Sequence, residues 1–159
     1  MQKRKEVKSK ESINNTRTVR QNYDVDSNIS NQKLLLDFSI IDKGHNLWGF
    51  KNLKTVDSFS DLLNKLSNYC SMTWNEILRA SGGKKEGNGN NNHFCKMDGF
   101  CKDAKERLEE LKQECDELFS LRLQSNIRLY GIRDRSIFKP IWYDAYHGKE
   151  DKEAYITKH

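Results

Sequence analysis

The chain has 159 residues, of which 35% are hydrophobic and 32% are charged, and its formal net charge is +5. This length is typical of one domain with a single core. No run of 18 apolar residues is present, and residues 1–32 lack the apolar segment of a secretory signal. The sequence therefore excludes a helix that spans a membrane and favours a cytoplasmic location.

The positive charge is unevenly distributed along the chain. Residues 1–20 hold seven Lys and Arg against two Glu, which accounts for the whole net charge. Because residues 1–32 contain few large apolar side chains, we predict a disordered basic tail there. Residues 102–117 carry an excess of acids and residues 118–147 an excess of bases. This segregation indicates a functional face within the folded part of the chain.

Two elements are expected before the first helix. Residues 33–42 alternate between apolar and polar side chains, which predicts a strand. A turn at residues 43–46 allows residues 47–53 to return as a second, shorter strand. The N-terminal element is thus a strand or a hairpin.

Two helices are predicted next. Residues 59–70 place apolar side chains at helical spacing, and Ser58 is the expected N-cap. A second, short helix begins at the capping box formed by Thr73 and Glu76 and is expected to end at Gly82.

The middle of the chain combines a loop, an edge strand and a third helix. Residues 82–92 are rich in Gly and Asn, which predicts a polar loop. A short edge strand is expected at residues 93–97, and a helix at residues 102–117. His93, Cys95 and Cys101 are an alternative metal site, but their spacing matches no standard pattern. We expect no metal and no other cofactor.

Residues 118–147 contain three period-two runs rich in β-branched and aromatic residues, separated by short polar breaks. This pattern predicts a three-strand antiparallel meander. One face is predicted to be apolar. The other is predicted to carry four basic residues, Arg122, Arg128, Arg133 and Lys139. Residues 148–159 are expected to form a polar, loosely packed C-terminal tail.

The order of these elements predicts an α+β fold. We expect a two-layer domain over residues 33–147, in which the N-terminal strand or hairpin and three helices pack on the C-terminal meander.

The meander resembles that of the RelE/ParE superfamily of bacterial toxins, and locally the YoeB-type members. The resemblance rests on two arginine-containing runs, Arg122-Leu123 and Arg128-Leu129, joined by a short polar turn, and on the final pair Tyr146-His147. It implies a metal-free endoribonuclease, acting on RNA or at the ribosome, and an antitoxin or other protein partner.

The resemblance also implies roles for individual residues. Arg128 would stabilise the scissile phosphate, and His147 would act in acid–base chemistry on the RNA. We therefore expect Arg128, Tyr146 and His147 to be catalytic, and the remaining basic residues of the face to bind substrate: Arg122, Arg133 and Lys139. The chain departs from the family at Gly148, where YoeB-type toxins have a tyrosine. Only Glu114 and Glu117 lie in the region of the family's helix-borne glutamate.

Two alternatives to an endoribonuclease stay open. The same basic face suits a non-catalytic protein that binds nucleic acid, because arginine forms bidentate contacts with phosphate. The second alternative is an interaction protein of a phage or mobile element, which a partner holds along the third helix. The arginines would then pair with neighbouring acids rather than with a substrate.

Overall fold

The computed structural model describes residues 28–81 and 91–157. The predicted disorder of residues 1–27 and the predicted loop at 82–90 lie outside this part of the chain. The elements, with η for a 3-10 helix, are β1 (Leu35–Leu36), η1 (Phe50–Asn52), α2 (Val56–Cys70), α3 (Trp74–Arg79), β2 (His93–Lys96), η2 (Met97–Gly99), α4 (Lys102–Glu110), β3 (Glu117–Arg122), β4 (Arg128–Asp134) and β5 (Ile137–Asp144). Helices and one sheet confirm the predicted α+β class.

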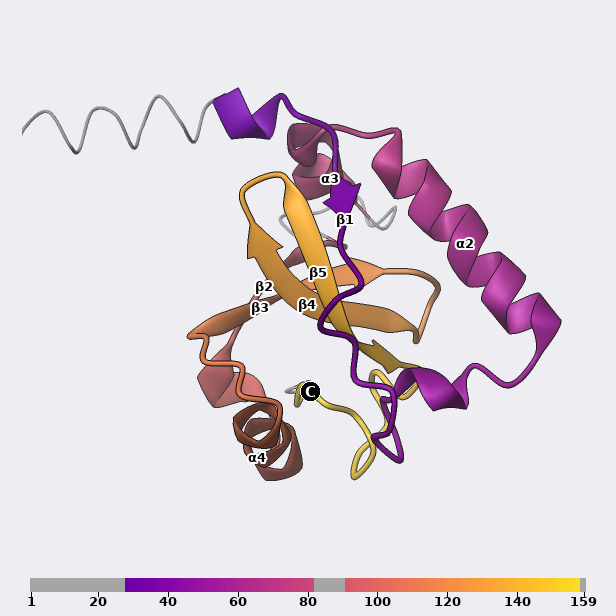
Figure 1. Cartoon of the computed structure of the whole chain (residues 1–159), viewed down its shortest axis with the longest axis vertical. Coiled ribbons are helices and arrows are strands. Elements are labelled where there is room, and N and C mark those ends of the chain that lie inside the picture. Colours follow the sequence, from indigo (N-terminus) through magenta and orange to yellow (C-terminus); the bar gives the residue numbers. More distant parts are fainter. Residues whose placement is uncertain (1–27, 82–90, 158–159) are drawn as a thin grey trace, which may run out of the picture.

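The sheet has five strands in the order β1-β5-β4-β3-β2 (Figure 1). The strands β3, β4 and β5 form the predicted antiparallel meander. On one side the sheet is extended by β2, which pairs antiparallel with β3, as expected for the predicted edge strand. On the other side, β1 pairs parallel with β5 and lies between β5 and α2 in Figure 1.

Both faces of the sheet are covered, whereas the sequence predicted helices on one face only. Neighbouring residues on a strand point to opposite faces, and Leu118 and Phe119 belong to two different core clusters. The first cluster contains residues of α2 and α3, and η1 packs against it. The second contains residues of α4 and the C-terminal segment, and η2 packs against it. We call these the α2/α3 face and the α4 face. No helix in the described ranges is long and apolar enough to cross a membrane.

The predicted N-terminal hairpin is wrong. The strand predicted at 33–42 is reduced to Leu35–Leu36, and residues 47–53 form turns and η1. Side chains take the backbone donors that a second strand would need. Asp42 Oδ1 accepts from the N–H groups of Gly44 and His45, and His45 Nδ1 accepts from those of Leu47 and Trp48. Such local bonds compete with pairing into a strand.

The helices largely follow their predicted starts. Helix α3 begins with the predicted capping box, in which Thr73 is the N-cap and Glu76 lies in the first turn, but it ends at Arg79 rather than at Gly82. Helix α2 is capped by Thr55, which forms a capping box with Ser58, so Ser58 lies inside the helix rather than at its cap.

The third predicted helix is shorter than expected, because α4 ends at Glu110. Lys112 has a φ of 55°, and its N–H donates to the carbonyl of Glu109, while Gln113 N–H donates to that of Leu108. This pair of bonds is the Schellman motif, which terminates helices. The chain is thereby released to enter β3 at Glu117.

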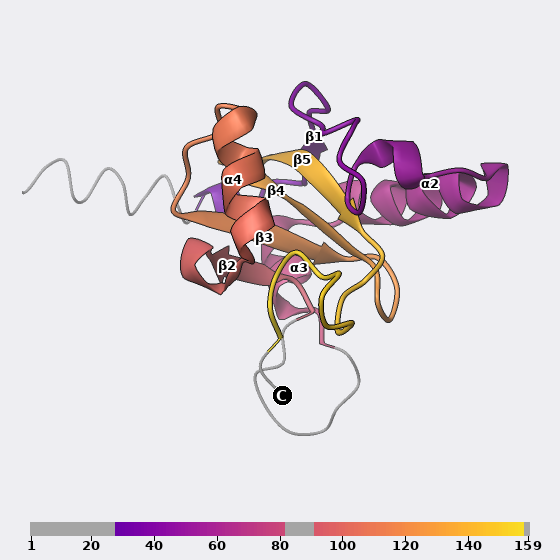
Figure 2. The same ribbon diagram turned by 90° about the horizontal axis from the view of Figure 1, so that it is seen from below.

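The C-terminal segment is packed, contrary to the loose tail predicted there. Ala154 is fully buried, and Tyr155 forms a bridge with Phe100. Figure 2 shows this segment turning back from the end of β5. At the other end of the chain, Ile29 is also buried, so residues 28–32 belong to the fold and not to the predicted tail.

A bulge in the middle of the sheet depends on Gly131. Tyr130 pairs with Trp142 and Gly131 with Pro140, which leaves Ile141 as an extra residue in β5. A Cβ at Gly131 would lie 2.3 Å from the Lys139 carbonyl oxygen. Ile141 and Trp142 consequently both pack on the α4 face.

A buried carboxylate joins three separate parts of the chain. Asp42 is 1% exposed and accepts two bonds of 2.9 Å from the Arg107 guanidinium of α4, and one of 3.0 Å from the Trp142 indole of β5. Burial opposes its ionisation, but the bonds from Arg107 and Trp142 outweigh burial and hold the pKa of Asp42 far below its ordinary value of 3.8.

The bulge yields a first test. Replacing Gly131 with Ala should lower the free energy of unfolding by about 1–3 kcal/mol, because the new methyl group overlaps backbone atoms. Urea denaturation measures this. At Gly44 a Cβ would meet only Arg107 Nη2, at 3.9 Å, so Gly44→Ala should be nearly neutral. Equal effects of the two substitutions would contradict the assignment.

The hydrogen bonds that Asp42 accepts from Arg107 and Trp142, which we call the Asp42 anchor, provide a second test. Asp42→Asn should lower the free energy of unfolding by roughly 3 kcal/mol, because the donors of Arg107 and Trp142 lose a charged acceptor. Glu110→Gln removes only the exposed ion pair with the same Arg107 and should cost less than about 1 kcal/mol. Since the pKa of Asp42 is lowered in the folded state, the ionised carboxylate stabilises the fold above pH 3.8, and this stabilisation is lost as the pH falls. The loss in the free energy of unfolding caused by Asp42→Asn should therefore become smaller at acidic pH, which urea denaturation at several pH values measures.

Candidate functional site

Two arginines lie side by side on the α4 face, where β3 ends and β4 begins. Arg122 of β3 is the direct cross-strand partner of Arg128, and Arg128 is opposite Asp144 of β5. His93 of β2 is opposite Ser120, two residues before Arg122, and therefore lies on the same face. Together with His147, these residues form what we call the arginine–histidine cluster: His93, Arg122, Arg128 and His147.

The turn between β3 and β4 holds Arg128 in place. Its Nη1 donates to the carbonyls of Gln124, Ser125 and Ile127, at 2.9, 3.1 and 3.1 Å. The residue is only 8% exposed, and burial followed by the charge of Arg122 lowers its pKa. All three bonds involve Nη1, so Nε and Nη2 are not taken by these carbonyls.

Arg122 is held by two asparagines. Its Nη1 donates to Asn91 Oδ1 at 2.7 Å, and its backbone N–H donates to Asn92 Oδ1 at 2.9 Å. Asn92 is buried and also donates to the carbonyl of Ile77 in α3. The sequence placed both asparagines in a polar loop, but here they tie α3 to the end of β3.

His147 reaches the cluster from beyond β5. Its backbone N–H donates to the carbonyl of Asn126 in the β3–β4 turn, at 3.1 Å. Its Nδ1 is buried and has no hydrogen-bond partner within the described residues. Burial first, and then the charge of Arg128, lowers the pKa of His147. The imidazole is therefore mainly neutral near pH 7 and able to accept a proton.

Two buried carboxylates clamp the segment that carries His147. Asp144 accepts from the N–H groups of Tyr146 at 2.7 Å and Ala154 at 2.9 Å. Glu153 accepts from Gly148 N–H at 2.7 Å and from Thr157. Burial raises the pKa of Asp144 to about 6, with a further increase from Glu153 that the two backbone donors and Arg128 only partly offset.

Tyr146 lies next to the cluster but is oriented by other contacts. Its ring packs against the α4-face core, and the ammonium groups of Lys149 and Lys152 lie 5.9 and 5.6 Å from its centre. These distances permit cation–π attraction. The structure thus combines an aromatic surface with two lysines beside His147.

Two of the predicted substrate-binding residues lie elsewhere. Arg133 is on the α2/α3 face, where its guanidinium lies 4.1 Å from the ring centre of Trp74. Lys139 is on the α4 face but at the opposite end, opposite Ile132, with its ammonium 3.3 Å from Asp134. The predicted single basic face is therefore wrong, because the strands place Arg133 on the opposite face and Lys139 about 13 Å further along the sheet.

The acids of the third predicted helix do not neutralise the two cluster arginines. Ion pairs within the described residues involve Lys102, Arg107 and Lys139 as cations, and neither Arg122 nor Arg128. Glu117 begins β3 and Arg122 ends it, a separation of about 17 Å along the strand, and Glu114 lies earlier still. Neither glutamate can therefore act on a group held by the two arginines.

The alternative metal site is not supported by the described residues. No group of three His, Cys, Asp or Glu side chains among them is arranged to hold a metal ion. Cys95 lies in the core, and burial raises its pKa to about 12, which disfavours the thiolate that metals bind. Cys101 is half-buried at the start of α4.

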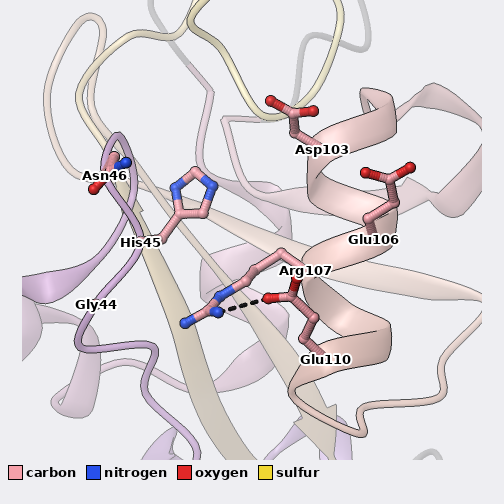
Figure 3. A pocket seen from close by; sticks show the side chains of 7 residues that line it. All are labelled: Gly44, His45, Asn46, Asp103, Glu106, Arg107 and Glu110. Atoms are coloured by element: carbon pink, nitrogen blue, oxygen red, sulfur yellow. Dashed lines mark hydrogen bonds and ion pairs between the residues drawn. The ribbon is translucent and has the colours of Figure 1, made fainter.

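A separate hollow of about 270 Å³ lies between α4 and the loop at 44–46 (Figure 3). Asp103 and Glu106 project from the helix, and His45 projects from the loop toward it. His45 stacks on Trp48 with ring centres 4.2 Å apart, and its Nδ1 is occupied by backbone N–H groups. The charge of Arg107 is used by Asp42 and Glu110. Because His45 and Arg107 are already engaged in contacts that hold the fold together, we interpret this hollow as a structural feature rather than a binding site.

Sequence reasoning missed several residues of the site. Asp144 stands within an apolar stretch between Ile141 and Ala145, and an acid at such a position is a signal of a buried carboxylate. His93 was weighed only as a metal ligand, and Asn91 only as part of a loop. Their proximity to the arginines depends on the pairing of β2 with β3, which the local sequence does not specify.

The pKa of Asp144 provides a test of the buried clamp. A carboxyl whose pKa is raised binds its proton more tightly in the folded state, so it stabilises the fold below pH 6 relative to pH 7. When the pH is lowered from 7 to 5, the free energy of unfolding of the wild type should increase by about 1 kcal/mol relative to that of Asp144→Asn. Urea unfolding at both values measures the difference. The exposed Asp134→Asn is the control and should show no such gain; a gain of equal size there would refute the assignment.

Comparison of the chain with protein-family models, curated proteins and solved structures gives no match. What this chain does must therefore be argued from the arginine–histidine cluster and from the fold that assembles it.

Proposed function

We propose that the protein is a RelE/YoeB-like endoribonuclease that cleaves RNA at the arginine–histidine cluster. One observation carries the proposal. Arg122 and Arg128 are adjacent on one face of the sheet, and within the described residues no carboxylate forms an ion pair with either of them. Two adjacent like charges repel each other, so a bound phosphodiester would stabilise the pair.

Each residue has a role that follows from its surroundings. Arg122 and Arg128 bind the scissile phosphate and stabilise the charge that develops on it during cleavage. Since its pKa is lowered, His147 is neutral and accepts the proton of the attacking 2′-hydroxyl. Tyr146, with Lys149 and Lys152, offers a surface on which a neighbouring base stacks close to a positive charge.

The fold is compatible with the resemblance to the RelE/ParE superfamily. Support comes from the antiparallel meander, in which Arg122, Arg128 and the Tyr146-His147 pair occupy one end of the sheet. The additions are β2, η2 and α4, and Gly148 with a φ of 79° stands where YoeB-type toxins have a tyrosine. We propose RNA at the ribosome as the substrate and an antitoxin-like protein as the partner, both from the resemblance.

A non-catalytic RNA-binding protein is the second candidate. The observation in its favour is the use of Arg128 Nη1 as a cap for the β3–β4 turn. An arginine fixed in this way also stabilises the fold, and its neighbour Arg122 alone would then supply most of the contact with RNA.

Cleavage and binding can be separated with purified variants. On single-stranded RNA with EDTA present, His147→Ala should lower the cleavage rate by about 10²–10⁴-fold while leaving RNA affinity within a few-fold of wild type. Arg122→Ala should weaken binding and reduce the slope of log affinity against log salt by about 1. Arg122 is preferred to Arg128 because its loss leaves the turn intact.

The matched control is Lys139→Ala, which removes a basic residue at the opposite end of the sheet and should change neither rate nor affinity. Induced expression should also arrest bacterial growth in a manner relieved by His147→Ala. RNA binding by a wild type that does not cleave would favour the non-catalytic candidate. The absence of both activities would refute the proposal.

A further inference from the structure

Proton transfer in RNA cleavage requires two groups. One removes the proton of the 2′-hydroxyl, and the other donates a proton to the departing 5′-oxygen. His147 supplies one of them in the function proposed above. The second must face the same phosphate, so it has to come from the α4 face near Arg122 and Arg128.

The buried carboxylates are poor choices for this role. Both oxygens of Asp144 accept backbone N–H groups, and both oxygens of Glu153 accept bonds from Gly148 or Thr157. These bonds occupy the oxygens of both acids and hold the segment that carries His147, so neither acid is placed to exchange a proton with RNA. Glu117 lies at the far end of β3, and Glu114 precedes that strand.

His93 has the position that the second group requires. It is exposed, and its cross-strand partner Ser120 is two residues from Arg122 on the same face. Arg122 is tied to Asn91, two residues before His93, by a bond of 2.7 Å. His93 and His147 also interact electrostatically. The pKa of His147 is lowered by burial, by Arg128 and then by His93, whereas Glu153 raises it.

We propose that His93 is a catalytic residue, the proton donor to the leaving group that works with His147 across a phosphodiester held by Arg122 and Arg128. This inference rests on the proposed endoribonuclease function. In the step, His147 takes the proton of the 2′-hydroxyl, and the 2′-oxygen forms a bond to phosphorus. The bond from phosphorus to the 5′-oxygen breaks, and that oxygen takes its proton from His93. The products are a 2′,3′-cyclic phosphate and a 5′-hydroxyl.

Charges from several neighbouring elements act on His147. Arg122 of β3, Arg128 of β4 and Glu153 of the C-terminal segment face His147, together with His93 of β2. The rate should rise with pH as His147 loses its proton.

The test compares two substrates. On RNA, His93→Ala should slow cleavage by about 10²–10⁴-fold. On a nucleoside 3′-(p-nitrophenyl phosphate), whose leaving group needs no proton, the same variant should lose less than about tenfold. His147→Ala should be slow on both substrates, since the 2′-hydroxyl must be deprotonated in each. Lys96→Ala, an exposed residue on the same strand β2, is the matched control and should resemble wild type.

The outcomes separate the inference from the proposed function. If wild type cleaves RNA and His93→Ala does so equally fast, or if His93→Ala is equally impaired on both substrates, the role of His93 is refuted and the endoribonuclease stands. If wild type cleaves neither substrate, the endoribonuclease is refuted, and this role with it. Thermal melting checks that each variant is folded.

Discussion

The fold depends on one buried ion, the carboxylate of Asp42. An isolated carboxylate in a core is very costly, and this one is tolerated because the Arg107 guanidinium, the Trp142 indole and two backbone N–H groups surround it. These donors come from the N-terminal loop, α4 and β5. The bonds therefore fix the layer on the α4 face, which a hydrophobic contact alone would leave free to slide.

With the α4 face closed in this way, the sheet has an apolar layer on each side, and the candidate site lies at one end of it. At one end Lys139 pairs with Asp134. At the other end, neither Arg122 nor Arg128 forms an ion pair within the described residues, although Asp144 lies opposite Arg128 on the neighbouring strand. The charge of Asp144 offsets the repulsion between the two guanidinium groups only in part. The remaining repulsion costs stability, and proteins retain such a cost where a ligand compensates for it.

The segment after β5 connects stability to the candidate chemistry. Asp144 and Glu153 bind the backbone of residues 146–157 and thereby hold His147 against the β3–β4 turn. The same burial that raises the pKa of Asp144 lowers that of His147, because a low-polarity environment favours the neutral form of both groups. The cluster thus combines a neutral imidazole with two charged guanidinium groups.

The sequence alone determined the α+β class, the meander, and α3 with its capping box, because these depend on local periodicity and local hydrogen bonds. The candidates Arg128 and His147 rested instead on a family resemblance, and Arg122 on the alternation of side chains along the strands. Tertiary structure decided the rest. Helices cover both faces of the sheet, Arg133 lies against Trp74, and His93 lies near Arg122. All three features depend on strand pairing between distant residues. A side chain's face and neighbours follow from that register, and a one-residue shift would reverse them.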